Sequence, residues 1–252
     1  MSQALVGRQR RRPKKADKGQ DAPALTREAI VEAAIKLLDG SDLENFSMRN
    51  LAKELGVYPT AIYWHIPSRN AVIAAVISKI MDNLTPPPSD DWKEWLKDLF
   101  RNYRATIKRH PNISPLIGVQ LVSNASVDLD LIEGILRALV NAGFPKHTLP
   151  TAYNVVQSAM VGFTTEEFAL APKEEADEWA EGMQNMLMDV DAEAHPLLVE
   201  SLNQMKNRSF ILRWQNGVDA PMDESFEMSI DVTIRGLESL QKDLTKAGGN
   251  QD

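Results

Sequence analysis

The chain has 252 residues, of which 43% are hydrophobic and 25% charged, a composition typical of a globular protein with one large or two modest domains. It contains no cysteine, which excludes a disulfide framework, a thiol nucleophile and a cysteine-based zinc site. No apolar run approaches the roughly 20 residues needed to span a bilayer, and the N-terminus lacks the apolar core of a signal peptide. We therefore expect a soluble, cytoplasmic protein with no membrane partner.

The net charge of −7 is unevenly distributed. Residues 1–20 hold seven basic residues and one aspartate, so this segment carries +6 and the remainder −13. Because residues 1–21 show no apolar period, we expect a disordered basic arm. Such an arm can lie on DNA phosphates or enter a minor groove beside a bound site. A solvated tail that only aids solubility is the alternative.

Two N-terminal segments carry clear helix signals. Residues 26–40 begin with Thr26, a suitable N-cap, and place apolar residues at helical spacing. Residues 46–69 (FSMRNLAKELGVYPTAIYWHIPSR) hold two short helical patterns joined by a tight turn. Ser47 is a good N-cap for the first pattern, and Pro59 suits the first turn of the second. We expect the helix over 26–40 to pack behind this pair.

The spacing within the pair is that of a helix-turn-helix. With Met48 counted as position one, Ala52 falls at five, Gly56 at nine and Ile62 at fifteen. A small residue at five lets the second helix approach, glycine makes the bend, and an apolar residue at fifteen fixes the crossing. The outward residues of the second helix offer hydroxyls, aromatic rings and a methyl group, which suit a major groove. A plain helical hairpin could use the same glycine turn.

Residues 25–81 resemble the DNA-binding domain of the TetR family of bacterial transcriptional regulators. The segment AIYWHIPSRNAVIAAVISKI is similar to the Tet repressor class in particular. One departure is Met48, which stands where many members carry threonine or serine. The resemblance and the outward face of the second helix together predict the residues that face DNA: Arg49, Tyr58, Pro59, Thr60, Ala61, Tyr63, Trp64, His65 and Arg69.

A fourth helix is expected over residues 69–81, running away from the recognition helix. If it carries on into the next domain, rotating it would move the recognition helix, which is the second helix of the helix-turn-helix, so this fourth helix is the natural lever. Residues 85–91 (TPPPSDD) then break the chain, because consecutive prolines cannot continue a helix. We therefore predict a DNA-binding domain over 22–84, a helical ligand-binding and dimerisation domain over 91–244, and a flexible tail over 245–252.

The second domain reads as helical throughout, with no clean period-two strand. The fold class is therefore all-α, with an N-terminal three-helix helix-turn-helix domain and a larger helical effector-binding and dimerisation domain. The acidic stretch 173–189 either extends or follows the helix before it. The other helices are expected at about residues 91–110, 113–122, 127–141, 147–171, 196–210 and 223–244.

The last helix bears on oligomeric state. Phe226, Ile230, Ile234 and Leu237 form one stripe, with further apolar residues alongside. The segment is similar to the terminal helix of Tet-repressor-type domains, where two helices from each subunit form a four-helix dimer interface. A core-facing helix in a monomer is the alternative. A homodimer also suits the first domain, because two recognition helices roughly 34 Å apart can read two half-sites of a palindrome.

By resemblance, the second domain binds a small-molecule effector that shifts the lever helix. Aromatic, methionine and polar side chains are candidates to line its pocket, although such stripes are more often ordinary core. His110, in RHPNISPL, could bind metal, but a single histidine at a helix end is more often a cap or a hydrogen-bonding residue, so no metal is assigned. The candidate effector-binding residues are Tyr103, Tyr153, Gln157, Met160, Phe163, Trp179 and Met183.

Enzyme signatures are lacking. The four histidines form no His-Glu-x-x-His motif, and the chain has no Gly-x-Ser-x-Gly elbow, Walker loop or dinucleotide fingerprint. We expect no catalytic residues and no cofactor. The predicted function is a ligand-responsive DNA-binding regulator, a repressor released from a palindromic double-stranded operator when a small molecule binds. The alternative is a helical small-molecule-binding protein or an enzyme of unknown activity.

Overall fold

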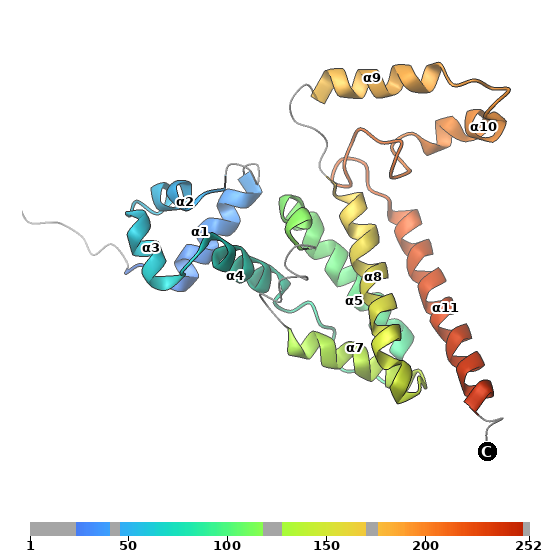
Figure 1. Cartoon of the computed structure of the whole chain (residues 1–252), viewed down its shortest axis with the longest axis horizontal. Coiled ribbons are helices and arrows are strands. Elements are labelled where there is room, and N and C mark those ends of the chain that lie inside the picture. Colours follow the sequence, from blue (N-terminus) through green and yellow to red (C-terminus); the bar gives the residue numbers. More distant parts are fainter. Residues whose placement is uncertain (1–23, 41–45, 118–127, 170–175, 249–252) are drawn as a thin grey trace, which may run out of the picture.

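The computed structural model describes residues 24–40, 46–117, 128–169 and 176–248, and every regular element within these ranges is a helix (Figure 1). The all-α prediction is therefore confirmed. The expected basic arm (1–21) and part of an expected helix (118–122) lie outside the described residues. In the part of the chain that the structure describes, no helix combines the length and apolarity needed to cross a membrane.

Three of the four helices in the N-terminal unit begin at a residue whose side-chain oxygen caps the helix. Thr26 Oγ1 accepts from Ala29 N at 3.1 Å, and Ser47 Oγ accepts from Asn50 N at 3.2 Å. Ser68 caps the fourth helix in the same way, by accepting from Ala71 N. Each such cap stabilises its helix by about 1 kcal/mol. The helices are α1 (Arg27–Gly40), α2 (Met48–Glu54), α3 (Pro59–His65) and α4 (Arg69–Met81).

The core of this unit draws on every one of its helices. Helix α1 packs along α4 and against α2, while α3 lies on α2 at the outer edge of the unit (Figure 1). Short helices of this length are marginal alone, so their shared apolar face holds them. Completely buried members of that face are Ile30, Leu38, Leu51, Ile62 and Val72.

The C-terminal unit begins after the proline-rich segment 85–90, which forms no helix. Four of its helices pack side by side, whereas α9 and α10 lie beyond the end of α8 (Figure 1). Helix α4 contacts α5 and so joins the two units. The elements are α5 (Trp92–Arg109), η2 (Pro111–Ile113), α7 (Leu129–Asn141), η3 (Lys146–Thr148), α8 (Leu149–Glu167), α9 (Ala176–Met188), α10 (Pro196–Met205) and α11 (Asp223–Gly248).

Three helix ends differ from the sequence-based expectation. Helix α8 ends at Glu167 instead of residue 171, and the backbone oxygen of Glu167 accepts from Gly217 N at 2.8 Å instead of continuing the helix. Helix α10 ends at Met205 instead of residue 210, because Asn207 adopts a left-handed backbone with φ 55°. Helix α11 continues to Gly248, past the expected end at residue 244.

The two sides of α11 have different surroundings. The stripe of Phe226, Ile230, Ile234 and Leu237 is buried in the chain's own core. A partner subunit would therefore contact other residues of this helix. A second row of apolar residues is exposed in the isolated chain, and a Cβ added to Gly236 on the same side would meet nothing within 4 Å. The exposed row consists of Met228, Val232 and Leu240.

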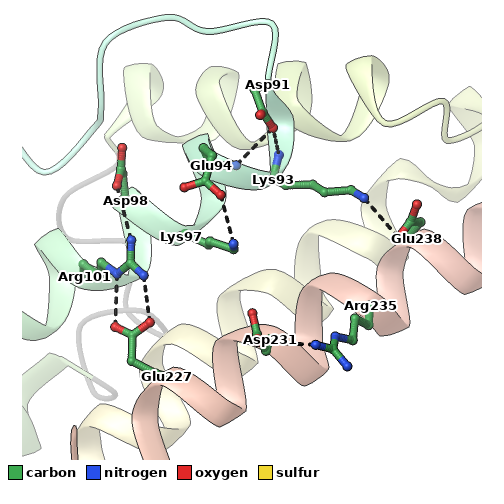
Figure 2. Close-up of polar contacts among 10 residues, drawn as sticks. All are labelled: Asp91, Lys93, Glu94, Lys97, Asp98, Arg101, Glu227, Asp231, Arg235 and Glu238. Atoms are coloured by element: carbon green, nitrogen blue, oxygen red, sulfur yellow. Dashed lines mark hydrogen bonds and ion pairs between the residues drawn. The ribbon is translucent and has the colours of Figure 1, made fainter. Parts of the chain in front are cut away.

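Ion pairs line the junction of α5 with α11 (Figure 2). Arg101 binds Glu227 through two hydrogen bonds of 2.7 and 3.1 Å, and Lys93 Nζ lies 3.0 Å from a Glu238 oxygen. These side chains are partly exposed, and pairs in water add little net stability. The buried apolar stripe of α11 is therefore the main contribution to the packing of these helices. Asp91, at the start of α5, caps that helix through the backbone N–H groups of residues 93 and 94.

Candidate nucleic-acid interface and effector domain

The helix-turn-helix has the internal geometry that its spacing predicts. Ala52 is 1% exposed where α2 meets α3, and Ile62 on α3 is fully buried. Gly56 has φ 65°, a left-handed conformation that glycine adopts without the penalty paid by other residues. Met48 is buried as well, so its side chain does not replace the hydroxyl group that many family members carry here. The turn and its two helices therefore form a rigid support.

The outer face of α3 presents large aromatic side chains to solvent. Tyr58 is 83% exposed, Trp64 89% and Tyr63 45%. Burying a large apolar side chain is worth about 1.5–3 kcal/mol, so this short helix leaves considerable stabilisation unused unless another surface covers it. Thr60 and His65 are exposed beside them, while Pro59 and Ala61 are half-buried.

The two arginines of the predicted interface differ. Arg49 on α2 is exposed, and its position beside α3 keeps it in the predicted DNA-facing set. Arg69, at the start of α4, donates from Nε to the backbone oxygen of Phe46 at 3.1 Å, and its guanidinium lies 5.5 Å from the Phe46 ring centroid. Arg69 therefore also fastens α4 to the start of α2, a role that its sequence position did not reveal.

A polar bridge joins the two units away from the α4–α5 contact. His110 Nδ1 lies 2.9 Å from a carboxylate oxygen of Asp39, the residue before the end of α1. Asn112 Nδ2 donates to the backbone oxygens of Leu38 at 3.0 Å and Asp39 at 3.3 Å, which cap the C-terminal end of α1. Of the alternatives for His110, the structure thus shows the hydrogen-bonding one: the residue lies at the end of α5 and contacts a carboxylate.

The candidate effector-binding residues do not form one group in the described chain. Tyr103 on α5 and Met160 on α8 are buried in the core, and burial raises the pKa of the Tyr103 hydroxyl. Tyr153, Gln157 and Phe163 are half-buried on α8. Trp179 and Met183 are half-buried on α9, which does not pack along α5 or α8 (Figure 1).

A cavity of about 230 Å³ lies elsewhere, between the proline-rich segment and α7. Trp95 forms part of its wall and donates from Nε1 to the backbone oxygen of Pro86 at 3.2 Å. Gly134 lies against the Trp95 ring, where a Cβ would come within 2.6 Å of the nearest ring carbon. None of the candidate effector-binding residues lines this cavity.

Sequence reasoning missed a buried polar cluster where α5, α8 and α11 meet. Glu167 has no exposed surface, and both of its oxygens bind the Arg104 guanidinium, at 2.6 and 2.7 Å. Arg104 also lies 2.7 Å from Asp223. Glu167 directly follows the exposed Glu166, and no sequence pattern distinguishes the buried glutamate from the exposed one. The basic residues of α5, Arg104 among them, were the available signal.

A helix-turn-helix joined to a helical domain defines a DNA-binding regulator. The model for bacterial regulatory proteins of the tetR family matches residues 30–76. The model for the tetracyclin repressor-like C-terminal domain matches residues 85–241. The chain therefore belongs to the TetR family, in its Tet-repressor-like C-terminal class. It is a ligand-responsive DNA-binding transcriptional regulator that acts as a homodimer.

Relatives and solved structures agree with this assignment. The class C tetracycline repressor protein of Escherichia coli is 27% identical over 228 residues, which cover 86% of this chain and 92% of the relative. The structure of BioQ with its double-stranded DNA operator has a TM-score of 0.54 at 29% identity, covering 57% of this chain and 88% of that one. Apo ActR from Streptomyces coelicolor shares the fold, with a TM-score of 0.68 at 19% identity, covering 89% of this chain and all of ActR.

Proposed function

We propose that the homodimer is a repressor that holds a palindromic operator through α3 and leaves it when a small molecule binds the C-terminal domain. The observation that carries this is the outer face of α3, where Tyr58, Tyr63 and Trp64 stand in solvent on a rigid support. The similarity to a tetracycline repressor and to an operator-bound regulator also supports the proposed repressor function. Two copies of α3 would enter successive major grooves roughly 34 Å apart.

The exposed groups suggest separate tasks within the interface. Thr60 on α3 and Arg49 on α2 can reach base edges, where hydroxyl and guanidinium groups read sequence. We assign Tyr63 and Arg69 to phosphate contacts, which position the protein without specifying sequence. Tyr58 and Trp64 offer apolar rings for thymine methyl groups and sugars.

The exposed apolar row of α11, together with Val155 on α8, suits the dimer interface. On α11 the row of Met228, Val232 and Leu240 passes Gly236, which costs about 1 kcal/mol of helix propensity relative to alanine. Nothing in the described chain approaches Gly236, so a second subunit is the natural source of a close contact there. On α8, Val155 is 42% exposed, which adds an apolar contact from the neighbouring helix. Two helices from each subunit would then form a four-helix interface.

Release follows from differential binding. A ligand can shift the regulator only if it binds the DNA-free arrangement better than the DNA-bound one. Helix α4 contacts α5, and the segment after α5 holds the end of α1, so a change in the C-terminal unit has two routes to the recognition helix. We further infer a cytoplasmic location, where the chromosome lies, and a regulatory role without catalysis.

Fluorescence anisotropy on DNA flanking the protein's own gene tests the proposal, with excess nonspecific competitor and a stated salt concentration. Competitor-resistant binding with two protomers per site is the expected result. Binding that disappears with modest salt would show a general electrostatic attraction only. A complete lack of binding at low salt would contradict the proposed operator recognition.

A further inference from the structure

A buried arginine between α10 and α11 has an unused hydrogen-bond donor. Arg213 is 9% exposed. Its Nε donates to the backbone oxygen of Gln215 at 2.7 Å, and Nη1 lies 3.1 Å from Met222 Sδ. Nη2 is buried, and no residue in the described part of the chain accepts from it. Buried charged groups are normally paired, so this atom calls for an acceptor.

The neighbouring carboxylates are already occupied. Glu167 accepts from both Arg104 nitrogens and, at 3.0 Å, from Met222 N. Asp223 binds Arg104, and its side chain is 70% exposed. Burial lowers the pKa of Arg213, and the charge of Glu167 opposes this only in part. Both carboxylates of the cluster therefore bind Arg104, and in the described part of the chain neither forms a hydrogen bond with Arg213.

Aromatic rings border the same cluster. The Phe163 ring meets Phe210 edge-on at a centroid distance of 5.1 Å and Phe226 at 5.5 Å. The Arg104 guanidinium lies 4.5 Å from the Phe226 centroid. Phe210 is 38% exposed, so its ring also faces solvent. A molecule with a flat apolar body and a negative group matches these surroundings.

We propose that Arg213 anchors the carboxylate of an aromatic effector through Nη2, with the apolar body against the Phe163–Phe210 pair. This inference rests on the proposed ligand-responsive function and specifies the chemical class of the ligand. Arginine suits this role because its guanidinium is always charged and matches carboxylate geometry. Nη2 is closed to solvent in this conformation, so the ligand enters by displacing residues 206–222, which contain no regular helix.

The position of the Arg213 site explains how a bound ligand would affect the helices around it. Met222, which contacts Arg213, directly precedes α11, and its N–H is held by Glu167 at the end of α8. Arg104 brings α5 into the same cluster. Figure 1 shows that the C-terminal end of α8 and the N-terminal end of α11 lie on the same side of the unit. An anion here would therefore act on the helices assigned to the dimer interface.

The test compares 1-naphthoate with its uncharged counterpart 1-naphthamide, using thermal unfolding and calorimetric titration of the full chain. Naphthoate should raise the Tm of the wild type and of Arg208→Met, a control that removes an exposed arginine from the same segment. It should have no such effect on Arg213→Met, and naphthamide should have none on any variant. If the acceptor of Nη2 is only a water molecule, naphthoate and naphthamide should have the same effect on the Tm. Equal shifts with both, equal naphthoate shifts in wild type and Arg213→Met, or no shift in the wild type would overturn the proposal.

Two further measurements keep the result interpretable. Arg213→Met removes an uncompensated buried charge, so it should fold and unfold at or above the wild-type Tm without ligand. If Arg213→Met does not fold, Arg213→Lys is used instead, because it keeps the charge but loses the planar guanidinium group. Its affinity for naphthoate should fall about tenfold or more. An unchanged affinity would contradict the proposed role of Arg213. Operator binding is measured on the same samples. If the wild type does not bind the operator, the proposed function is contradicted. If it binds the operator but naphthoate does not shift its Tm, only this inference is contradicted.

Discussion

The helix caps of the N-terminal unit and the ion pairs of the C-terminal unit join residues at very different separations along the sequence. In the N-terminal unit, a cap such as Ser47 acts on a residue three positions away, and Gly56 makes a turn by its own backbone conformation. In the C-terminal unit, Arg104 binds a residue 63 positions away and Arg101 one 126 positions away. The caps fix where helices of the N-terminal unit begin, whereas the distant ion pairs tie together separate helices of the C-terminal unit. We expect DNA recognition to lie in the first unit and the response to a ligand in the second.

The sharpest test of that contrast removes the centre of the distant contacts. Glu167→Ala leaves the Arg104 guanidinium partly unpaired and should lower the free energy of unfolding by about 3–5 kcal/mol. Glu166→Ala changes the preceding, exposed residue and should alter it by no more than about 0.5 kcal/mol. Urea denaturation of both variants measures the difference. Similar stabilities would mean that the buried pair does not hold the C-terminal unit together.

On the recognition face, two single changes should separate reading from positioning. Thr60→Ala should change the preference between operator sequences, at about 1–3 kcal/mol for the affected base pair. Tyr63→Ala should weaken binding to all sequences by similar factors. Anisotropy titrations on the operator and on single-base variants give both values. If both variants fold normally and bind like the wild type, α3 is not the reading helix.

Loss of one local cap should have an intermediate effect. Ser47→Ala removes the acceptor for Asn50 N and should lower stability by about 1 kcal/mol, while Ser47→Asp should keep most of it because a carboxylate also caps. Chemical denaturation monitored by far-UV circular dichroism is suitable. The same cost for both substitutions would show that the hydroxyl does not act as a cap.

The smallest effect is expected at the partly exposed Arg101–Glu227 pair. A double-mutant cycle with alanine should give a coupling below about 1 kcal/mol that shrinks with added salt. Hydrogen bonds from Arg101 lower the pKa of Glu227 in the folded state. The coupling is therefore present at neutral pH, above the unfolded-state pKa, and is lost as the pH falls through the lowered folded-state pKa. A coupling that persists below this range would argue against an ion pair.

Sequence reasoning located what depends on neighbours along the chain. The caps at Thr26 and Ser47, the turn at Gly56 and the interruption of the helices at residues 85–91 were all predicted correctly, because each acts within a few positions. The partners of Arg104 and His110 were not predictable, since they come from elements whose packing no local pattern encodes. The stripe on α11 illustrates the same limit: periodicity showed an apolar face, but not whether its own core or another subunit covers it.

The bridge between His110, Asn112 and the end of α1 has a geometric consequence. Together with the α4–α5 contact, it attaches the DNA-binding unit at two separate places. A rigid body held at two points keeps a single degree of freedom, which is rotation about the line through those points. Any movement that preserves both attachments therefore follows one arc. In a dimer, two such arcs related by the symmetry axis would turn a change in either subunit into a change in the separation of the two α3 helices.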